Sequence, residues 1–104
     1  MVTLPSTPKA LYRGSVPAIW TDVYTTPASG QAIVTNIVAT NPDPATAASV
    51  TVHLGDTALL PGLGIPPSGV LTFDVRQVLK AGELINVRGS GAIAHLHISG
   101  VEVV

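Results

Sequence analysis

The sequence contains no cysteine, which removes several kinds of chemistry at once. A chain without thiols has no disulfide framework, no thiolate metal site and no cysteine nucleophile. Small secreted domains often depend on disulfides, so their absence favours a protein that folds in a reducing cytoplasm. No apolar run approaches the roughly 18 residues of a transmembrane helix. Pro5 and Pro8 also interrupt the start, where a signal peptide needs an apolar stretch. We therefore expect no membrane association.

Charge is also scarce. Asp, Glu, Lys and Arg make up 11% of the chain, and the net charge is −1, whereas typical soluble domains carry about 25% charged residues. The basic residues are scattered: Lys9, Arg13, Arg76, Lys80 and Arg88. Nucleic-acid binding needs a basic stripe, so the sequence argues against such a partner. A nearly neutral surface suits contact with other proteins; the plainer alternative is a compact domain in which Ala and Thr replace charges.

The 104 residues are enough for one domain with one core. The chain is rich in Val, Ile and Thr, which favour strands, and nine Pro and ten Gly interrupt every long helical pattern. This predicts an all-β fold of about eight short antiparallel strands in a β-sandwich, either jelly-roll or Ig-like. The predicted strands span 9–13, 18–25, 31–40, 49–54, 57–60, 69–75, 84–88 and 92–104.

Other features give the expected organisation. Residues 1–8 form a Pro-rich N-terminal arm that we expect to lie along a neighbour, and 9–104 form the sandwich. A turn is expected at 41–44 and a loop at 61–67, with at most one short helical turn at 77–80. In 31–40, Ile33, Ile37 and Ala39 share one face and Val34 and Val38 the other, which indicates a central strand covered on both sides. Gly100 is expected to form a bulge that turns Val101 and Val103 inward.

His95 and His97 are the candidate metal ligands. At i and i+2 on a strand, their side chains leave the same face about 7 Å apart. They could supply two ligands of a metal site, with His53 as a third, and a trimer could gather six imidazoles around one ion. The alternative is a pair of polar residues facing solvent or an interface. No acidic residue strengthens the motif, so we favour the alternative and expect no metal and no cofactor.

Catalytic signatures are sparse. Six carboxylates are present, but no aromatic-rich sugar cleft accompanies them. No Gly-x-Ser-x-Gly stretch occurs, and Gly62-Leu-Gly64 and Gly89-Ser-Gly91 lack the context of a phosphate loop. A sugar platform built from Trp20, Tyr24 and Tyr12 is one possibility, and burial of Trp20 in the core is the favoured one. We expect no catalytic residues and no enzymatic activity.

The sequence resembles small β-sandwich structural proteins of tailed bacteriophage virions over roughly residues 10–103. The stretches that carry the resemblance are Val23-Tyr-Thr-Thr-Pro-Ala-Ser-Gly-Gln-Ala-Ile-Val-Thr-Asn-Ile-Val38, Val50-Thr-Val-His-Leu54, Ile65-Pro-Pro-Ser-Gly69, Leu79-Lys-Ala-Gly-Glu-Leu-Ile85 and Leu96-His-Ile-Ser-Gly-Val-Glu-Val103. The resemblance implies a non-enzymatic virion component, assembled in the host cytoplasm, and transfers no catalytic residue.

Three functions remain open at this point. The first is a capsid decoration or cement protein that binds the major capsid protein, with a homo-oligomer, preferably a trimer, adding avidity. The second is a subunit that binds tail or baseplate proteins, including an adhesin-like module that contacts host-surface carbohydrate. The third is a small carbohydrate-active or metal-dependent enzyme.

Overall fold

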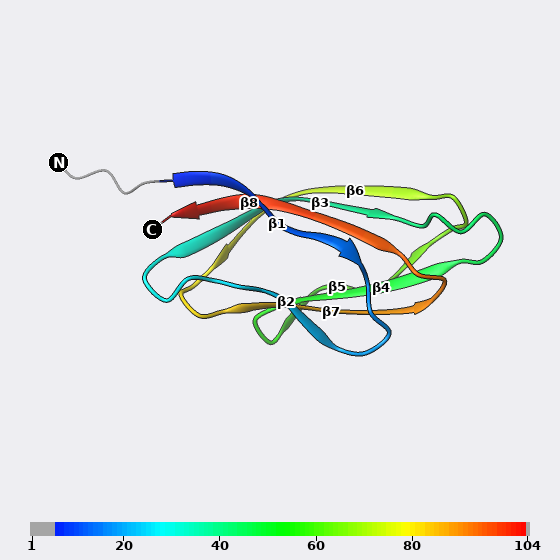
Figure 1. The fold of residues 1–104 in the computed structure, drawn as a ribbon, viewed down its shortest axis with the longest axis horizontal. Coiled ribbons are helices and arrows are strands. Elements are labelled where there is room, and N and C mark those ends of the chain that lie inside the picture. Colours follow the sequence, from blue (N-terminus) through cyan, green and yellow to red (C-terminus); the bar gives the residue numbers. More distant parts are fainter. Residues whose placement is uncertain (1–5, 104) are drawn as a thin grey trace.

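The computed structural model describes residues 6–103, and these form eight strands in two four-stranded sheets (Figure 1). The all-β prediction is confirmed. The strands are β1 (Ser6–Ser15), β2 (Thr21–Thr25), β3 (Gln31–Thr40), β4 (Ala48–Leu54), β5 (Thr57–Ile65), β6 (Val70–Leu79), β7 (Leu84–Gly91) and β8 (His95–Val103). Sheet A has the order β1-β8-β3-β6, sheet B the order β2-β7-β4-β5, and every pairing is antiparallel.

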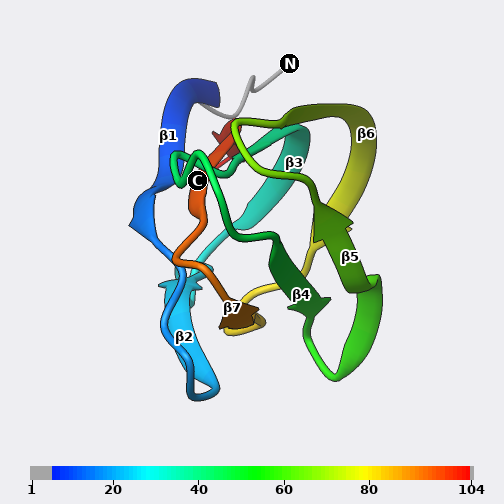
Figure 2. The ribbon, with the colours of Figure 1, turned by 90° about the vertical axis from the view of Figure 1, so that its right-hand side faces the viewer.

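The strand order decides between the two expected sandwich types. Apart from the hairpin from β4 to β5, each connection carries the chain from one sheet to the other. The two sheets form facing layers when viewed from the end (Figure 2). An Ig-like sandwich keeps its first two strands in one sheet, whereas here β1 and β2 lie in different sheets. The order is that of a jelly roll, two Greek keys wrapped into two sheets.

The core fills the space between the sheets with aliphatic side chains. The largest that are fully buried are Ile37, Ile65, Leu79, Ile85, Leu96, Ile98, Val34, Val50, Val52 and Val87. The sandwich is therefore held together mainly by burial of branched aliphatic surface, as the composition predicts.

Within the described residues, no helix is long and apolar enough to cross a membrane.

A bulge at Thr35 changes the faces expected for β3. The bounds 31–40 are correct, and β3 is a central strand of sheet A. However, Val34 pairs with Gly100 and Asn36 with Ser99, which leaves Thr35 as an extra residue. The phase therefore shifts, and Val34 rather than Ile33 is buried with Ile37. Strict alternation could not predict this, because a bulge places two residues opposite one.

The expected bulge at Gly100 is also wrong. The pairing irregularities opposite this part of β8 lie in β1 and β3, and β8 itself keeps its alternation. Gly100 continues the buried side of the strand, where a Cβ would lie 2.2 Å from the carbonyl oxygen of Ile33 and 2.8 Å from Leu11 Cδ1. Glycine is required there by close packing. The alternation consequently directs Glu102 inward, in place of Val101 and Val103.

One further expectation needs correction, and one optional element does not form. The loop predicted at 61–67 is mostly strand, because β5 extends to Ile65, which is fully buried and pairs with Ala48. Pro61 is tolerated there because β5 is an edge strand. The helical turn allowed at 77–80 is absent, since residues up to Leu79 belong to β6 and Val78 pairs with Ile33.

The N-terminal arm has a later part that belongs to the sandwich. Ser6, Thr7 and Pro8 pair with Val103, Glu102 and Val101 of β8. The predicted boundary at residue 8 is therefore too late, because the β8 edge offers hydrogen bonds to this segment. Residues 1–5 lie outside the described residues, and docking of an arm on a neighbour stays a prediction for them.

The expected turn after β3 is built as its chemistry predicts. The Asp43 carboxylate accepts hydrogen bonds from the backbone N–H groups of Ala45 and Thr46, at 2.8 and 2.9 Å, and these bonds lower its pKa. Asn41 is buried, and its amide donates to the carbonyl oxygens of Thr46 at 2.8 Å and Ile65 at 3.2 Å. The Asn41 side chain thus joins this turn to the end of β5.

Candidate functional site

The histidine pair lies on the outer face of sheet A. Leu96 and Ile98 of β8 are buried, so the alternating His95 and His97 face away from the core. His97 is opposite Arg13 in β1, which places a cation on the same face and opposes binding of a metal ion. His53 lies in β4, in the other sheet, and is not a third ligand for the pair.

Among residues 6–103, no group of three or more His, Cys, Asp or Glu side chains could hold a metal ion. A metal role for His95 and His97 alone stays an untested alternative. The pair does not by itself provide the three or four protein ligands that are usual for zinc.

Three carboxylates of the described chain, those of Asp22, Asp74 and Glu83, take part in separate structural contacts. Asp22 accepts from Asn86 Nδ2 at 2.6 Å, and Asp74 accepts from Asn36 Nδ2 at 3.1 Å. Glu83 accepts from the Lys80 backbone N–H at 2.7 Å and closes the turn before β7. These contacts fasten strands and turns, and none of them brings two carboxylates together in the way that a glycosidase pair requires.

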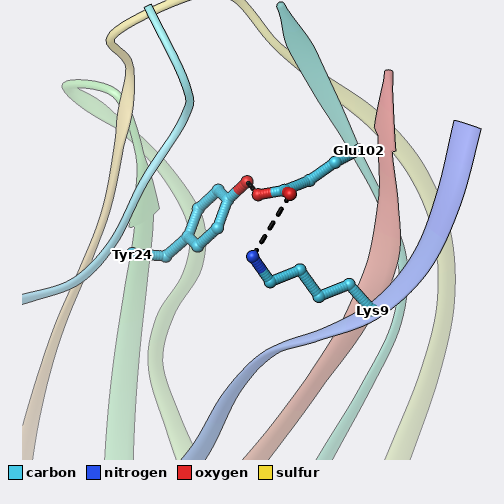
Figure 3. A network of polar contacts seen from close by, with 3 residues as sticks. All are labelled: Lys9, Tyr24 and Glu102. Atoms are coloured by element: carbon cyan, nitrogen blue, oxygen red, sulfur yellow. Dashed lines mark hydrogen bonds and ion pairs between the residues drawn. The ribbon is translucent and has the colours of Figure 1, made fainter. Parts of the chain in front are cut away.

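Sequence reasoning missed a polar contact between the two sheets (Figure 3). The Tyr24 hydroxyl of β2 donates a hydrogen bond to Glu102 Oε2 of β8, and Lys9 Nζ of β1 lies 3.2 Å from Glu102 Oε1. The Glu102 side chain is 13% exposed, whereas that of Lys9 is 50% exposed. The sequence did contain a signal for this contact, because strict alternation places Glu102 on the same face as Leu96 and Ile98. The bulge expected at Gly100 would have turned Glu102 to the opposite face.

The electrostatics of this network favour a structural role. Burial and the neighbouring Glu102 carboxylate raise the pKa of the Tyr24 phenol well above its usual range. The hydrogen bond from Tyr24, and then the Lys9 ammonium, lower the pKa of Glu102. At neutral pH Tyr24 is thus held protonated and Glu102 ionised, so neither group is poised to exchange a proton in general acid–base catalysis.

Trp20 is the aromatic side chain most available to a ligand. It was expected in the core, but it is 44% exposed and packs on His53, with 4.6 Å between ring centroids and 40° between planes. The alternative platform with Tyr24 and Tyr12 is also wrong. Tyr24 bonds Glu102 between the sheets, and Tyr12 packs against the core and donates to the Ser15 carbonyl at 2.6 Å. Trp20 precedes β2, so strand alternation does not govern its direction.

A shallow hollow adjoins Trp20 on the outer face of sheet B. It measures about 140 Å³ and is lined by Trp20, Ser49, Thr51, Arg88, Gly89 and Ser90. Ser49 is opposite Ser90 and Thr51 opposite Arg88 in the pairing of β4 with β7. Buried Val50, Val52 and Val87 alternate with these polar side chains, which therefore point outward. The site combines one exposed aromatic ring, one guanidinium and three hydroxyls.

No protein-family model and no curated protein matches the chain. Among solved structures, the chain is similar to one described as "Structure of infectious bursal disease virus Gx strain", with a TM-score of 0.43 and 8% sequence identity. The similarity covers 94% of this chain and 31% of that chain. At this level it transfers no residue role to the present protein, so function has to be argued from its own surface.

Proposed function

We propose that this protein is a non-enzymatic structural component of a bacteriophage virion, and specifically a capsid decoration or cement protein that binds the major capsid protein. The observation that carries the proposal is an apolar row across the outer face of sheet A, which we call the Val78 row. It consists of Pro8, Val101, Ile33 and Val78, paired in sequence across β1, β8, β3 and β6.

The row is an unusual surface for a solitary domain. Pro8 and Val78 are exposed, Val78 to 58%, and Ile33 and Val101 are half-buried. Val70, on the same edge strand, is 62% exposed. Charged residues make up only 11% of the chain, and Arg76, two positions before Val78 on β6, is the cation on the same face. An exposed apolar row of this kind marks contact with another protein. The sequence resemblance to phage virion sandwiches, which occur on heads and on tails, supports another virion protein as that partner.

The binding test uses virions or capsids that lack this protein, to which purified protein is added back. Val78→Asp is expected to weaken capsid binding at least tenfold, because it replaces an apolar contact with a carboxylate that would be buried unpaired. Ile93→Asp is the matched control, since Ile93 is 65% exposed but lies outside the row, between β7 and β8. Equal binding of both variants and the parent protein would refute the row as the docking face.

Copy number separates the capsid proposal from its alternative, a tail or baseplate subunit. Quantitative mass spectrometry of whole virions is expected to find hundreds of copies of a decoration protein. A handful of copies would exclude decoration and favour the tail position. The exposed Trp20 is the observation that favours the adhesin-like form of this alternative.

We further propose that the protein is a homo-oligomer, with a trimer favoured. A trimer seated at local three-fold positions of a capsid would make several weak contacts at once and so gain avidity. Light scattering coupled to size-exclusion chromatography measures the mass directly. A mass of about 10.6 kDa at all concentrations would contradict the oligomer, because this is the mass of one chain.

A further inference from the structure

We propose that the hollow beside Trp20 is a binding site for an acidic carbohydrate, in which Arg88 holds the carboxylate of a uronic-acid residue and Trp20 packs against the face of its ring. The site lies on sheet B, on the opposite side of the sandwich from the Val78 row. It therefore goes beyond the proposed capsid contact and could be occupied while that contact is made.

The aromatic part of the site is rigidly placed. The connection from β1 to β2 is fixed by hydrogen bonds from Val16 N to Ala94 O at 2.9 Å and from Gly89 N to Pro17 O at 2.8 Å. Packing on His53 supports one side of the Trp20 ring. A large amphipathic ring held at the surface costs little conformational entropy on binding, which favours recognition of the apolar face of a sugar.

The polar part of the site supplies both charge and hydroxyl recognition. Within residues 6–103, the structure contains one ion pair, between Lys9 and Glu102, so the Arg88 guanidinium is not paired with a carboxylate. Arginine forms bidentate hydrogen bonds with carboxylates, which fix orientation as well as charge. Thr51 Oγ1 already accepts a hydrogen bond from Gly62 N at 2.9 Å, which orients its hydroxyl and leaves its proton free to donate.

The dimensions and charge argue for a glycan over other ligands. A hollow of about 140 Å³ is far smaller than the ~300–1,000 Å³ of clefts that enclose drug-sized ligands, but an open hollow admits one ring of a longer chain. A single Arg is too little charge for a nucleic acid, which needs a basic stripe. The lining is also too polar for an apolar peptide anchor, because Trp20 is its one large apolar side chain.

The chain's single tryptophan makes the test direct, because all tryptophan fluorescence comes from Trp20. Titration with oligogalacturonate is expected to give a saturable change in intensity or emission wavelength. Arg88→Gln should weaken this binding about tenfold or more, the usual cost of losing a hydrogen bond to a charged group. Arg76→Gln is the matched control, since Arg76 is also exposed but lies in β6 of the other sheet.

Each contrary outcome contradicts a defined part of the proposal. The absence of a saturable signal, checked by calorimetry, would refute a carbohydrate site. Equal binding of a neutral oligosaccharide, unchanged in Arg88→Gln, would refute the acidic class. Tighter binding of an acetylated Glu-containing peptide than of oligogalacturonate would identify the hollow as a protein contact. Circular dichroism of the variants checks that they fold. Capsid binding by Val78→Asp is measured in a separate assay, so failure of the carbohydrate proposal and failure of the capsid proposal can be told apart.

Discussion

The contact between Tyr24 and Glu102 gives the sharpest test of how the two sheets are held together. Tyr24→Phe removes only the hydroxyl and keeps the ring that packs against the core. The Glu102 carboxylate would then keep Lys9 as its partner but lose the hydrogen bond from the opposite sheet. Hydrogen bonds to charged groups contribute about 1.5–3 kcal/mol to stability, so we expect the free energy of unfolding to fall by about 2 kcal/mol at pH 7.

A matched control is available in the other tyrosine. Tyr12 also donates one hydrogen bond, but to the neutral carbonyl oxygen of Ser15 at an exposed position. Tyr12→Phe should therefore cost only about 0.5–1 kcal/mol. Urea unfolding of both variants at pH 7 measures the difference. If Tyr24→Phe costs no more than Tyr12→Phe, the inter-sheet bond does not contribute what its geometry indicates.

The pH dependence checks the same reasoning by its sign. The pKa of Glu102 is lowered in the folded protein, first by the bond from Tyr24. Its stabilising contribution is therefore complete above the ordinary pKa, near pH 4.5, and is lost as the pH falls through the folded value. The stability difference between the parent protein and Tyr24→Phe should be largest at neutral pH and shrink below about pH 4.5. A difference that grows on acidification would refute the assignment of charge to Glu102.

Three further predictions follow from the packing and the polar contacts. Gly100→Ala should lower the free energy of unfolding by about 3 kcal/mol or more, because the alanine Cβ would overlap backbone atoms of Ile33. Gly64→Ala is the control, since a Cβ at Gly64 meets open space and the change should be nearly neutral. Thermal melts of both variants measure the difference. Asn41→Ala should cost about 2–3 kcal/mol in urea unfolding, since it removes the buried hydrogen bond to the Ile65 carbonyl oxygen and the partly buried one to Thr46. A cost below about 1 kcal/mol would contradict this. In Tyr12→Phe, where Tyr24 is the remaining tyrosine, absorbance at 295 nm should show no phenolate above about pH 10 until the protein unfolds; ionisation at the ordinary value would refute burial of the Tyr24 hydroxyl.

The sequence determined the class of the fold and most of its strands. Branched aliphatic residues in alternation, interrupted by Pro and Gly, admit little other than short strands, and the 31–40 strand is correct at both ends. The turn at Asn41 and Asp43 was also readable, because its hydrogen bonds are local. Structure that depends on residues close together in the sequence can be predicted from the sequence.

Tertiary structure decided the rest. The jelly-roll order, the bulge at Thr35 and the inward direction of Glu102 depend on which strands pair, and those partners are distant in sequence. The surface position of Trp20 depends on where the loop before β2 is fastened to β7. Alternation assigns the residues of a strand to two faces, but it does not say which face meets the core. A single bulge moves all residues beyond it to the opposite face. For that reason both candidate surfaces, the Val78 row and the hollow beside Trp20, became visible only when the sheets were assembled.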